Sequence, residues 1–307
     1  MNIPDVVVAG EIFVDWLMVG MDAWPEPGRE VYAQEFHREI GGGTAITACA
    51  LARLGLRCRL IAAVGTETSA WVAERLKSCG VTPELEVHPA EPTGVTVIAS
   101  RPEDRAFLTY LGANKAFVEA LGRRIASGKS LARHVHLSFP PPLDTKPSLI
   151  EQIRNLGSPV SLDVGWQRNW LSDRRAFNLL RSVDIFFPNY HEGVQMTGEQ
   201  DAHAILKKFA AEGIRRVALK LGSEGAALQW DNRTYFAKPK RVRPVDTTGA
   251  GDCFNAGFLY AWLQGANPET CLEWGNICGA LSTERYGGIE GCPDRDRLIT
   301  ELEKTPG

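Results

Sequence analysis

Short runs of apolar and β-branched residues alternate with stretches of helical periodicity along most of this 307-residue sequence. The predicted strands are 6–9, 60–64, 134–138, 160–163, 184–187 and 217–221. The predicted helices are 44–54, 69–78, 148–155, 174–181 and 202–211. Such alternation indicates βαβ crossovers, which place parallel strands side by side and cover both faces of their sheet with helices. The sequence therefore predicts an α/β fold with a largely parallel central sheet.

Two segments, 11–40 and 91–112, break this alternation. Both show strand-like alternation and turn signals such as Pro25-Glu26-Pro27-Gly28, with no helix between the strands. We expect them to form a small β-sheet that stands off the main sheet and acts as a lid over a site at the strand ends. Because the sequence contains no internal repeat, low-complexity tract or linker, residues 1–307 are expected to form a single domain. The exposed edges of such a lid also favour a homodimer.

Composition and charge narrow the class of protein. The formal net charge is −3 and 44% of the residues are hydrophobic, so neither a nucleic acid nor an anionic membrane is expected as a partner. The first ten residues lack the features of a secretory signal, and no apolar run approaches the ~18 residues of a membrane-spanning helix. The seven cysteines include no C-x-x-C pair, which favours reduced, mostly buried thiols. Together these features predict a cytoplasmic protein.

The densest glycine cluster lies in the segment Asp246-Thr247-Thr248-Gly249-Ala250-Gly251-Asp252, which opens a predicted helix reaching about Leu263. A helix start leaves backbone N–H groups without acceptors, and the helix dipole adds positive potential there, which suits a phosphate. Asp252 lies in the first turn, where a carboxylate could accept the proton of an attacking hydroxyl during phosphoryl transfer. A turn whose acidic residue merely caps the helix explains the same segment equally well.

A second cluster, Gly41-Gly42-Gly43, precedes a helix of small residues and would let a ligand approach closely. A dinucleotide fingerprint would need glycine at position 46, where this chain has Ile46, and a buried strand where 35–39 is polar. Segment 122–130 ends like a phosphate-binding loop but has five residues where that motif has four. The basic run 238–243 has no interleaved aromatics and is predicted to be a solvated strand edge.

Further candidates lie at predicted strand ends, where open α/β sheets bind ligands. Asn189 and Glu192 follow one strand and could hold Mg²⁺ through water, although a helix cap is the alternative. Lys220 ends another strand before the tight turn 222–225, which suits phosphates but is also an ordinary turn. Asp15, on a lid strand, could accept hydrogen bonds from a polyol, or it could simply face water.

Taken in order, these segments resemble the phosphofructokinase-B (PfkB) family, the ribokinase-like carbohydrate kinases, along essentially the whole chain. The most specific element is D-T-T-G-A-G-D at 246–252. The motifs G-G-G…L-A-R-L-G at 41–55, N-x-x-E at 189–192 and G-S-E-G at 222–225 follow the family order, and the segment 105–114 also looks like sugar kinases. The resemblance implies a three-layer αβα sandwich with a mainly parallel central sheet and a small β-sheet lid.

The resemblance also implies a role for each motif. Asp252 would be the catalytic base, and the anion hole would consist of Gly249, Ala250 and Gly251. The phosphoryl acceptor would contact Asp15, Gly41, Gly42, Gly43, Arg105 and Asn114. ATP would be bound by Asn189, Glu192, Lys220, Gly222, Ser223, Gly225 and Asn276. Glu192 would reach Mg²⁺ through water, and Asp246 and Thr248 match positions that hold a monovalent cation, so K⁺ activation is an expectation.

This chain departs from the family at Ile46, where many relatives carry an asparagine that touches the sugar. Because that polar contact is lost, we do not expect ribose or fructose to bind in the pose that is standard for the family. Trp16 and Trp24 in the lid are candidates to stack on a ring, with simple packing as the alternative. The sequence thus predicts an ATP- and Mg²⁺-dependent kinase acting on a hydroxyl of a sugar or sugar acid. A nucleoside kinase, with the lid tryptophans holding the base, and a non-catalytic sugar or nucleotide sensor remain alternatives.

Overall fold

The computed structural model describes residues 3–101 and 104–304. Within these residues the larger sheet has nine strands in the order β13-β12-β11-β10-β9-β8-β1-β4-β5. The seven strands from β11 through β10, β9, β8, β1 and β4 to β5 pair in parallel. Strands β12 and β13 complete the sheet in antiparallel pairing. The strands are β1 (Val6–Gly10), β4 (Cys58–Gly65), β5 (Thr82–His88), β8 (His134–Ser138), β9 (Val160–Asp163), β10 (Ile185–Phe186), β11 (Arg216–Lys220), β12 (Ala226–Trp230) and β13 (Arg233–Ala237). The predicted α/β fold with a mainly parallel sheet is confirmed.

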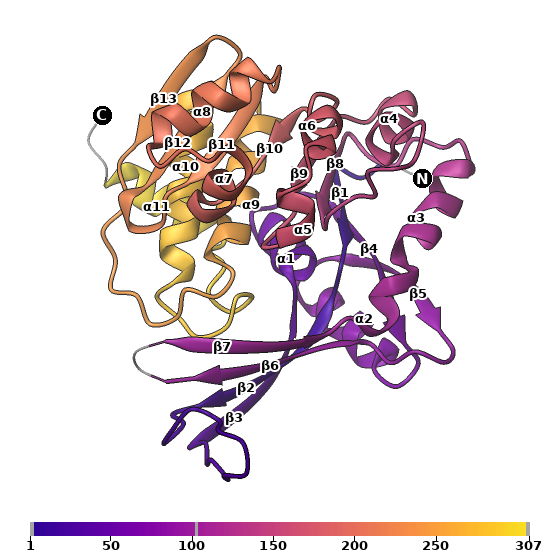
Figure 1. The fold of residues 1–307 in the computed structure, drawn as a ribbon, viewed down its shortest axis with the longest axis vertical. Coiled ribbons are helices and arrows are strands. Elements are labelled where there is room, and N and C mark those ends of the chain that lie inside the picture. The colour runs from indigo at the N-terminus through magenta and orange to yellow at the C-terminus, as the bar shows by residue number, and fades with distance from the viewer. Residues whose placement is uncertain (1–2, 102–103, 305–307) are drawn as a thin grey trace.

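Helices cover both faces of this sheet (Figure 1). Val6 and Val8 of β1 pack into one core, and Val7 and Ala9 pack into the other, because successive side chains of a strand point to opposite faces. The first core includes α1 (Gly43–Arg53), α2 (Ser69–Ser78), α9 (Ala250–Leu263), α10 (Pro268–Ser282) and α11 (Arg295–Glu303). The second includes α3 (Phe117–Ala126), α4 (Leu149–Asn155), α5 (Arg168–Leu171), α6 (Arg175–Leu180), α7 (Tyr190–Thr197) and α8 (Ala202–Ala211). The three predicted layers are therefore present.

The two segments predicted as the lid form a second, four-stranded sheet in the order β3-β2-β6-β7, which we call the small sheet. Its strands are β2 (Phe13–Val19), β3 (Glu35–Gly41), β6 (Gly94–Ser100) and β7 (Arg105–Tyr110). It projects away from the nine-stranded sheet (Figure 1). Leu17 and Ile98 on one of its faces line a hollow with Thr247, which lies far away in the sequence. Trp16, the neighbour of Leu17, points to the opposite face.

The prediction differed from the structure in several places. Strands β5, β12 and β13 and helices α3, α5, α7, α10 and α11 were not among the predicted elements. The basic run 238–243 was predicted to be a strand edge, but it is an irregular loop after β13. Pro239 and Pro244 cannot donate to a strand ladder, which explains why pairing stops at Ala237. Two short 3₁₀ helices, η1 (Gly112–Ala116) and η2 (Gly222–Glu224), complete the described elements.

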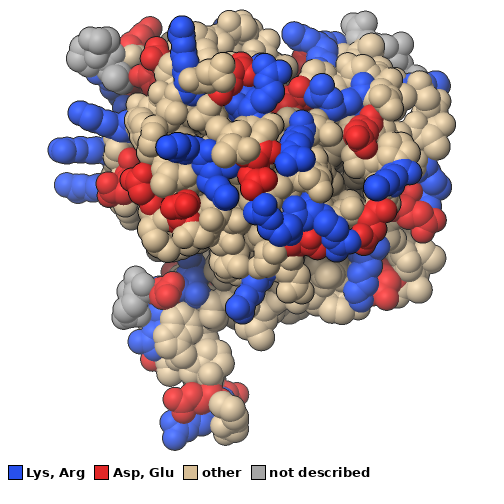
Figure 2. All heavy atoms as spheres, turned by 45° about the horizontal axis from the view of Figure 1, so that its top comes forward, with Lys and Arg blue, Asp and Glu red and all other residues tan. Residues whose placement is uncertain are grey.

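The remaining features of the molecule are its surface charge, the character of its helices and the state of its cysteines. Basic and acidic side chains are intermixed over the face shown in Figure 2. In the described part of the chain, no helix combines the length and the apolar character needed to cross a bilayer. All seven cysteines are buried free thiols.

Candidate active site

The carboxyl ends of the central strands bring several predicted residues together. Strands β1, β8 and β9 end in register, since Gly10 pairs with Ser138 and Ser138 pairs with Asp163. Farther along the sheet, β11 ends at Lys220, which forms an isolated parallel bridge with Asn189, three residues after the end of β10. Because all these strands run in the same direction, their polar end residues lie along one edge of the sheet.

The glycine cluster at 249–251 forms the start of α9, which faces this edge. Gly249 is the N-cap and has a left-handed backbone conformation with φ 73°, which favours glycine. A β-carbon at Gly249 would also lie 2.9 Å from the α-carbon of Gly288 and from Cδ1 of Ile46. The Ala250 N–H donates to the Thr247 carbonyl oxygen at 3.3 Å. The other N–H groups of this helix start have no acceptor within the helix, so they are available to a ligand.

Asp252 lies in the first turn of α9, beside the start of α1. A β-carbon at Gly43 would lie 2.6 Å from Oδ1 of Asp252 and 2.6 Å from Oγ of Ser138, so only glycine allows this approach. Burial, with the negative charge of Asp163 as a smaller cause, raises the pKa of Asp252 to about 7. A carboxylate with this pKa is a stronger base than an exposed aspartate.

A buried network that was not predicted from the sequence supports this carboxylate. Lys220 Nζ lies 2.6 Å from Oδ2 of Asp163, and Asn255 Nδ2 donates to the same oxygen at 2.7 Å. Burial opposes the charge of Asp163, but Lys220 and these hydrogen bonds hold the pKa of Asp163 below its ordinary value. Asp163 and Asn255 each had a signal in the sequence: Asp163 ends a predicted strand, and Asn255 lies three residues after Asp252.

Asn189 and Glu192 cap helix α7. The Asn189 side chain accepts from the Glu192 N–H at 2.9 Å, and Glu192 Oε2 accepts from the Asn189 N–H at 2.8 Å. Asn189 Nδ2 also donates to Glu192 Oε1 at 2.6 Å, so both carboxylate oxygens are engaged. Burial and the negative charge of Asp163 raise the pKa of Glu192 to about 7. The cap that was the structural alternative is therefore present, next to Lys220.

A cavity of about 540 Å³ contains most of the residues predicted to bind ATP, and we call it the nucleotide-side cavity. Ala250 and Gly251 of the predicted anion hole also line it. The predicted ATP-site residues in its wall are Lys220, Gly222, Ser223, Gly225 and Asn276. Two parts of the wall were not predicted: the apolar side, which includes Phe254, and the loop that carries Lys240, Arg241 and Val242.

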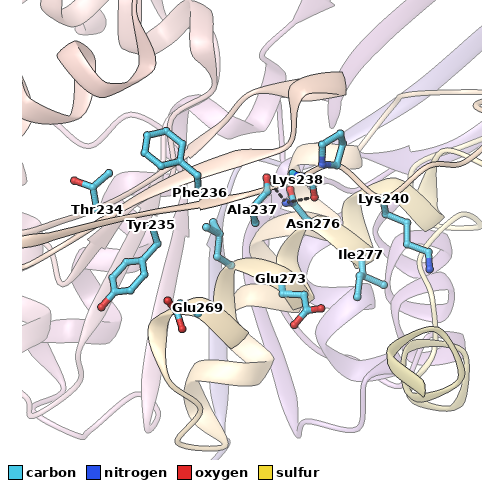
Figure 3. A pocket seen from close by; sticks show the side chains of 12 residues that line it. Thr234, Tyr235, Phe236, Ala237, Lys238, Lys240, Glu269, Glu273, Asn276 and Ile277 are labelled. Carbon is cyan, nitrogen blue, oxygen red and sulfur yellow. Dashed lines mark hydrogen bonds between the residues drawn. The ribbon is translucent and has the colours of Figure 1, made fainter. Parts of the chain in front are cut away.

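Asn276 also holds the loop that leads away from β13. Its Nδ2 donates to the carbonyl oxygens of Ala237 at 3.2 Å and Lys238 at 3.3 Å. Figure 3 shows these bonds, together with a second cavity of about 600 Å³ that opens on the outer side of Asn276, between β13 and α10. Asn276 therefore separates the two cavities, with its amide nitrogen bonded to backbone.

A smaller cavity of about 220 Å³ lies on the other side of the anion hole, and we call it the acceptor-side cavity. It is lined by Glu11, Phe13, Gly43, Ser138, Phe139, Asp163, Val164, Gly165, Gln167 and Asp252. Asp15 on β2 and Gly41 on β3 are not among the residues that line this cavity, but they touch each other. A β-carbon at Gly41 would lie 1.8 Å from Oδ2 of Asp15. Burial, together with the negative charge of Glu39, raises the pKa of Asp15 to about 7.

Three predicted residues near the acceptor have other surroundings. The Arg105 guanidinium contacts Asp246, Thr247 and Thr248 in the turn before the anion hole. The buried Asn114 side chain accepts from the Ile12 N–H at 3.1 Å and donates to the Ile12 carbonyl oxygen at 2.8 Å. Gly42 is the N-cap of α1 with φ 86°. These residues are not among those that line the acceptor-side cavity.

Asp246 and Thr248, the two positions of the expected K⁺ site, lie together. Oδ1 of Asp246 accepts from the N–H of Thr248 at 2.9 Å and from its hydroxyl at 2.7 Å, and Oδ2 accepts from the N–H of Gly287 at 2.9 Å. Among the described residues there is no group of three or more His, Cys, Asp or Glu that could hold a metal ion.

The chain matches known proteins along nearly its whole length. It is 33% identical to an ATP-dependent ribose-1-phosphate kinase of Halopiger xanaduensis, over 97% of this chain and 98% of the relative. It is 29% identical to a 2-dehydro-3-deoxygluconokinase of Bacillus subtilis, over 87% of each chain. The structure of Arabidopsis thaliana ribokinase complexed with ribose and ATP superposes with a TM-score of 0.83 at 26% identity, covering 98% of this chain and 99% of that one. Residues 4–295 match the model of the pfkB family carbohydrate kinases, and the chain therefore belongs to this family.

Proposed function

We propose that this protein transfers the γ-phosphoryl group of ATP to a hydroxyl of a sugar or sugar acid, with Asp252 as the base. One observation carries this proposal: the first turn of α9 lies between the nucleotide-side cavity and the acceptor-side cavity. Ala250 and Gly251 line the nucleotide-side cavity, and Asp252, the next residue, lines the acceptor-side cavity. A γ-phosphate held at the helix start would thus lie between its donor and a hydroxyl within reach of the base.

In this mechanism the residues of the chain position groups and move one proton. Asp252 accepts the proton of the acceptor hydroxyl as that oxygen attacks the γ-phosphorus. The N–H groups at 249–251 stabilise the charge on the transferred group. The Lys220 ammonium lies beside Gly251, since a β-carbon there would be 3.3 Å from Nζ. It would therefore face phosphates bound at the helix start.

Mg²⁺ would enter as the complex with ATP. Both oxygens of Glu192 already accept hydrogen bonds from Asn189, but a carboxylate has further lone pairs. This donor set suits contact through the waters that Mg²⁺ retains in proteins rather than direct coordination. Mg²⁺ supplies charge neutralisation on the phosphates, and Asn189 and Glu192 would orient its water shell.

For the monovalent cation site we propose that Arg105 supplies the charge that K⁺ would bring. Asp246 receives hydrogen bonds from Thr248 and Gly287, and the Arg105 guanidinium bonds to the same carboxylate. Asp246 is nearly buried, at 9% exposure, so its charge requires a partner. The guanidinium meets that requirement from within the chain.

We propose that the small sheet acts as a lid and that a second copy of the chain covers its outer face. The base of this sheet contributes Phe13 to the acceptor-side cavity, so movement of the sheet would open or close that cavity. The outer face, which carries Trp16, exposes four large side chains, Trp16, Phe36, Leu108 and Tyr110, with exposures of 41%, 54%, 62% and 48%. Apolar faces of this kind favour association, and the same face on a second copy is complementary by symmetry.

A nucleoside acceptor is less well supported. The nucleoside alternative relied on the lid tryptophans, but Trp16 packs edge-on against Phe36 at 5.9 Å on the outer face. Trp24 lies 5.9 Å from the guanidinium of Arg101. Neither is among the residues that line the acceptor-side cavity, so a base would have to rest on Phe13 or Phe139 instead.

A non-catalytic sensor would have no need of a base beside the helix start, and we therefore favour the kinase. We also propose that the protein works in the cytoplasm, since its seven thiols are unpaired.

The test of the kinase function is a coupled ADP-release assay over sugars, sugar acids and nucleosides with Mg²⁺, with and without K⁺. Turnover of a sugar or sugar acid supports the proposal. Tight ligand binding without ADP release across the whole panel would favour the sensor.

A further inference from the structure

We propose that the phosphoryl acceptor carries no negative charge: it is an uncharged polyhydroxy compound or its amino derivative, and not a sugar acid or sugar phosphate. This inference rests on the proposed function and narrows the substrate class of the same site. It separates the chain from the two relatives whose names describe phosphorylation of an acid and of a sugar phosphate.

The wall of the acceptor-side cavity carries charge of one sign. Glu11, Asp163 and Asp252 contribute carboxylates to it, and none of the described residues in this wall is Lys, Arg or His. The remaining polar side chains, Ser138 and Gln167, are neutral. A carboxylate or phosphate on the acceptor would therefore meet repulsion and no cation to pair with, whereas hydroxyl and ammonium groups would find acceptors.

Two carboxylates on this side lack partners of their own. Within the described residues, Glu11 and Asp15 make no hydrogen bond or ion pair, although most of the surface of each is covered by protein. Burial raises the pKa of Glu11. Their carboxylate oxygens are not among the fully buried polar atoms without a partner, so they remain accessible and can accept hydrogen bonds from donor groups of a ligand.

Two cations close to the site, Lys220 and Arg105, are already engaged. Lys220 bonds to Asp163 and also faces Asp252 and Glu192, so a single ammonium is shared among three carboxylates. Arg105 is bonded to Asp246 and the adjacent threonines, outside the cavity. MgATP bound at the anion hole would add further negative charge. An anionic acceptor would find no cation among the described residues that form the wall of the acceptor-side cavity.

The size and the apolar parts of the cavity are consistent with a single sugar unit. Its volume of about 220 Å³ is below the range of pockets for drug-sized ligands. Phe13 and Phe139 contribute ring faces, which pack against the C–H faces of a sugar, while the carboxylates accept from its hydroxyls.

The test uses acceptors that differ at one position, where a carboxylate or phosphate is replaced by a neutral or cationic group, and that share the other hydroxyls. D-gluconate, D-glucitol and 1-amino-1-deoxy-D-glucitol form one series. 2-Dehydro-3-deoxy-D-gluconate with 3-deoxy-D-fructose forms a second, and ribose 1-phosphate with methyl riboside forms a third. ADP release is measured at saturating MgATP. Binding of the same compounds is measured by calorimetry on protein loaded with a non-hydrolysable ATP analogue.

We expect kcat/KM for the uncharged or amino member to exceed that of its anionic counterpart by about tenfold or more. A ratio near one, a preference for the anion, or a panel in which no uncharged or amino member is turned over or bound would overturn the inference. Turnover of acids alone would leave the proposed kinase function intact. Binding of uncharged members without any ADP release would contradict the kinase function and leave the acceptor class standing.

A variant tests the cause. Glu11→Gln keeps the shape of the side chain and removes one charge, so the discrimination against the anionic member should shrink by about tenfold. The matched control is Glu26→Gln in the exposed 26–29 turn, where Glu26 pairs with Arg29 at 2.8 Å and the ratio should not change. If Glu11→Gln does not fold, ionic strength serves instead. Added salt should raise the relative kcat/KM of the anion in the wild-type protein, and an unchanged ratio would contradict charge repulsion.

Discussion

The guanidinium of Arg105, on strand β7 of the small sheet, bonds to the carboxylate of Asp246 in the turn that precedes the anion hole. The two residues are 141 positions apart in the sequence. The same guanidinium contacts the hydroxyls of Thr247 and Thr248, so one side chain joins the small sheet to the start of α9. The position of the small sheet is thereby coupled to the loop that would hold the γ-phosphate.

This contact predicts activity without potassium. Because Arg105 already neutralises Asp246, exchanging K⁺ for tetramethylammonium should change kcat of the wild-type protein by less than about twofold. Arg105→Ala removes a charged hydrogen-bonding partner worth about 1.5–3 kcal/mol, so kcat without K⁺ should fall about ten- to hundredfold. Adding K⁺ should restore part of it.

The control is Arg29→Ala, which removes an exposed arginine paired only with Glu26 among the described residues. That variant should keep wild-type kcat in both salts. A wild-type protein that is inactive until K⁺ is added would show that Arg105 does not replace the ion.

The role of Asp252 as base predicts a large loss of turnover without loss of ATP binding. Asp252→Asn cannot accept the proton, so kcat should fall about 10²- to 10⁴-fold, while the Kd of MgATP measured by calorimetry should stay within about threefold. Asp296→Asn, an exposed acid at the start of α11, is the matched control. Near-normal turnover of Asp252→Asn would exclude this residue as the base.

The pKa of Asp252 also predicts a pH profile. Only the deprotonated carboxylate can act as base, so kcat/KM should rise about tenfold per pH unit below pH 7 and level off above it. Since the charge of Asp163 raises the pKa of Asp252, Asp163→Asn should move the rising limb to lower pH. A profile in Asp163→Asn that coincides with the wild-type profile would show that another group controls it.

The sequence predicted what is local and periodic. The helix start at 249–252 and the strands that end at Ser138 and Lys220 followed from spacing and composition, because their conformations depend on neighbouring residues. Contacts between distant residues did not follow. The pair Lys220–Asp163 joins positions 57 residues apart, and no local pattern marks which strand-end carboxylate faces which cation.

The face of a lid strand that points to the site could not be predicted from the sequence either. Trp16 and Asp15 are neighbours, so they point to opposite sides of β2, and a shift of one residue exchanges their roles. The alternation alone does not say which side faces the acceptor. In the structure Asp15 shares a face of β2 with Phe13, which lines the acceptor-side cavity.

The bonds of Asn114 predict a structural role that can be separated from substrate binding. Asn114→Ala would leave the buried N–H and C=O of Ile12 without their partner, which should lower the free energy of unfolding by about 2–4 kcal/mol. Thermal unfolding measures this loss. Asn232→Ala, in the turn between β12 and β13, is the control and should change stability little. An unchanged Tm together with a raised KM would assign Asn114 to the substrate instead.

The outer face of the small sheet predicts a dimer that one charge should disrupt. Trp16 is 41% exposed and packs against Phe36, so in a pair of small sheets both rings would be buried against the second copy. Trp16→Glu would place a carboxylate in that apolar contact, and sedimentation at micromolar concentration should then show the monomer mass. Phe236→Glu replaces a phenylalanine that is 60% exposed on β13, the edge strand of the nine-stranded sheet, and should leave the dimer intact. A wild-type chain that sediments as a monomer would contradict the dimer itself, whereas a dimer that persists in Trp16→Glu would place the contact on another surface.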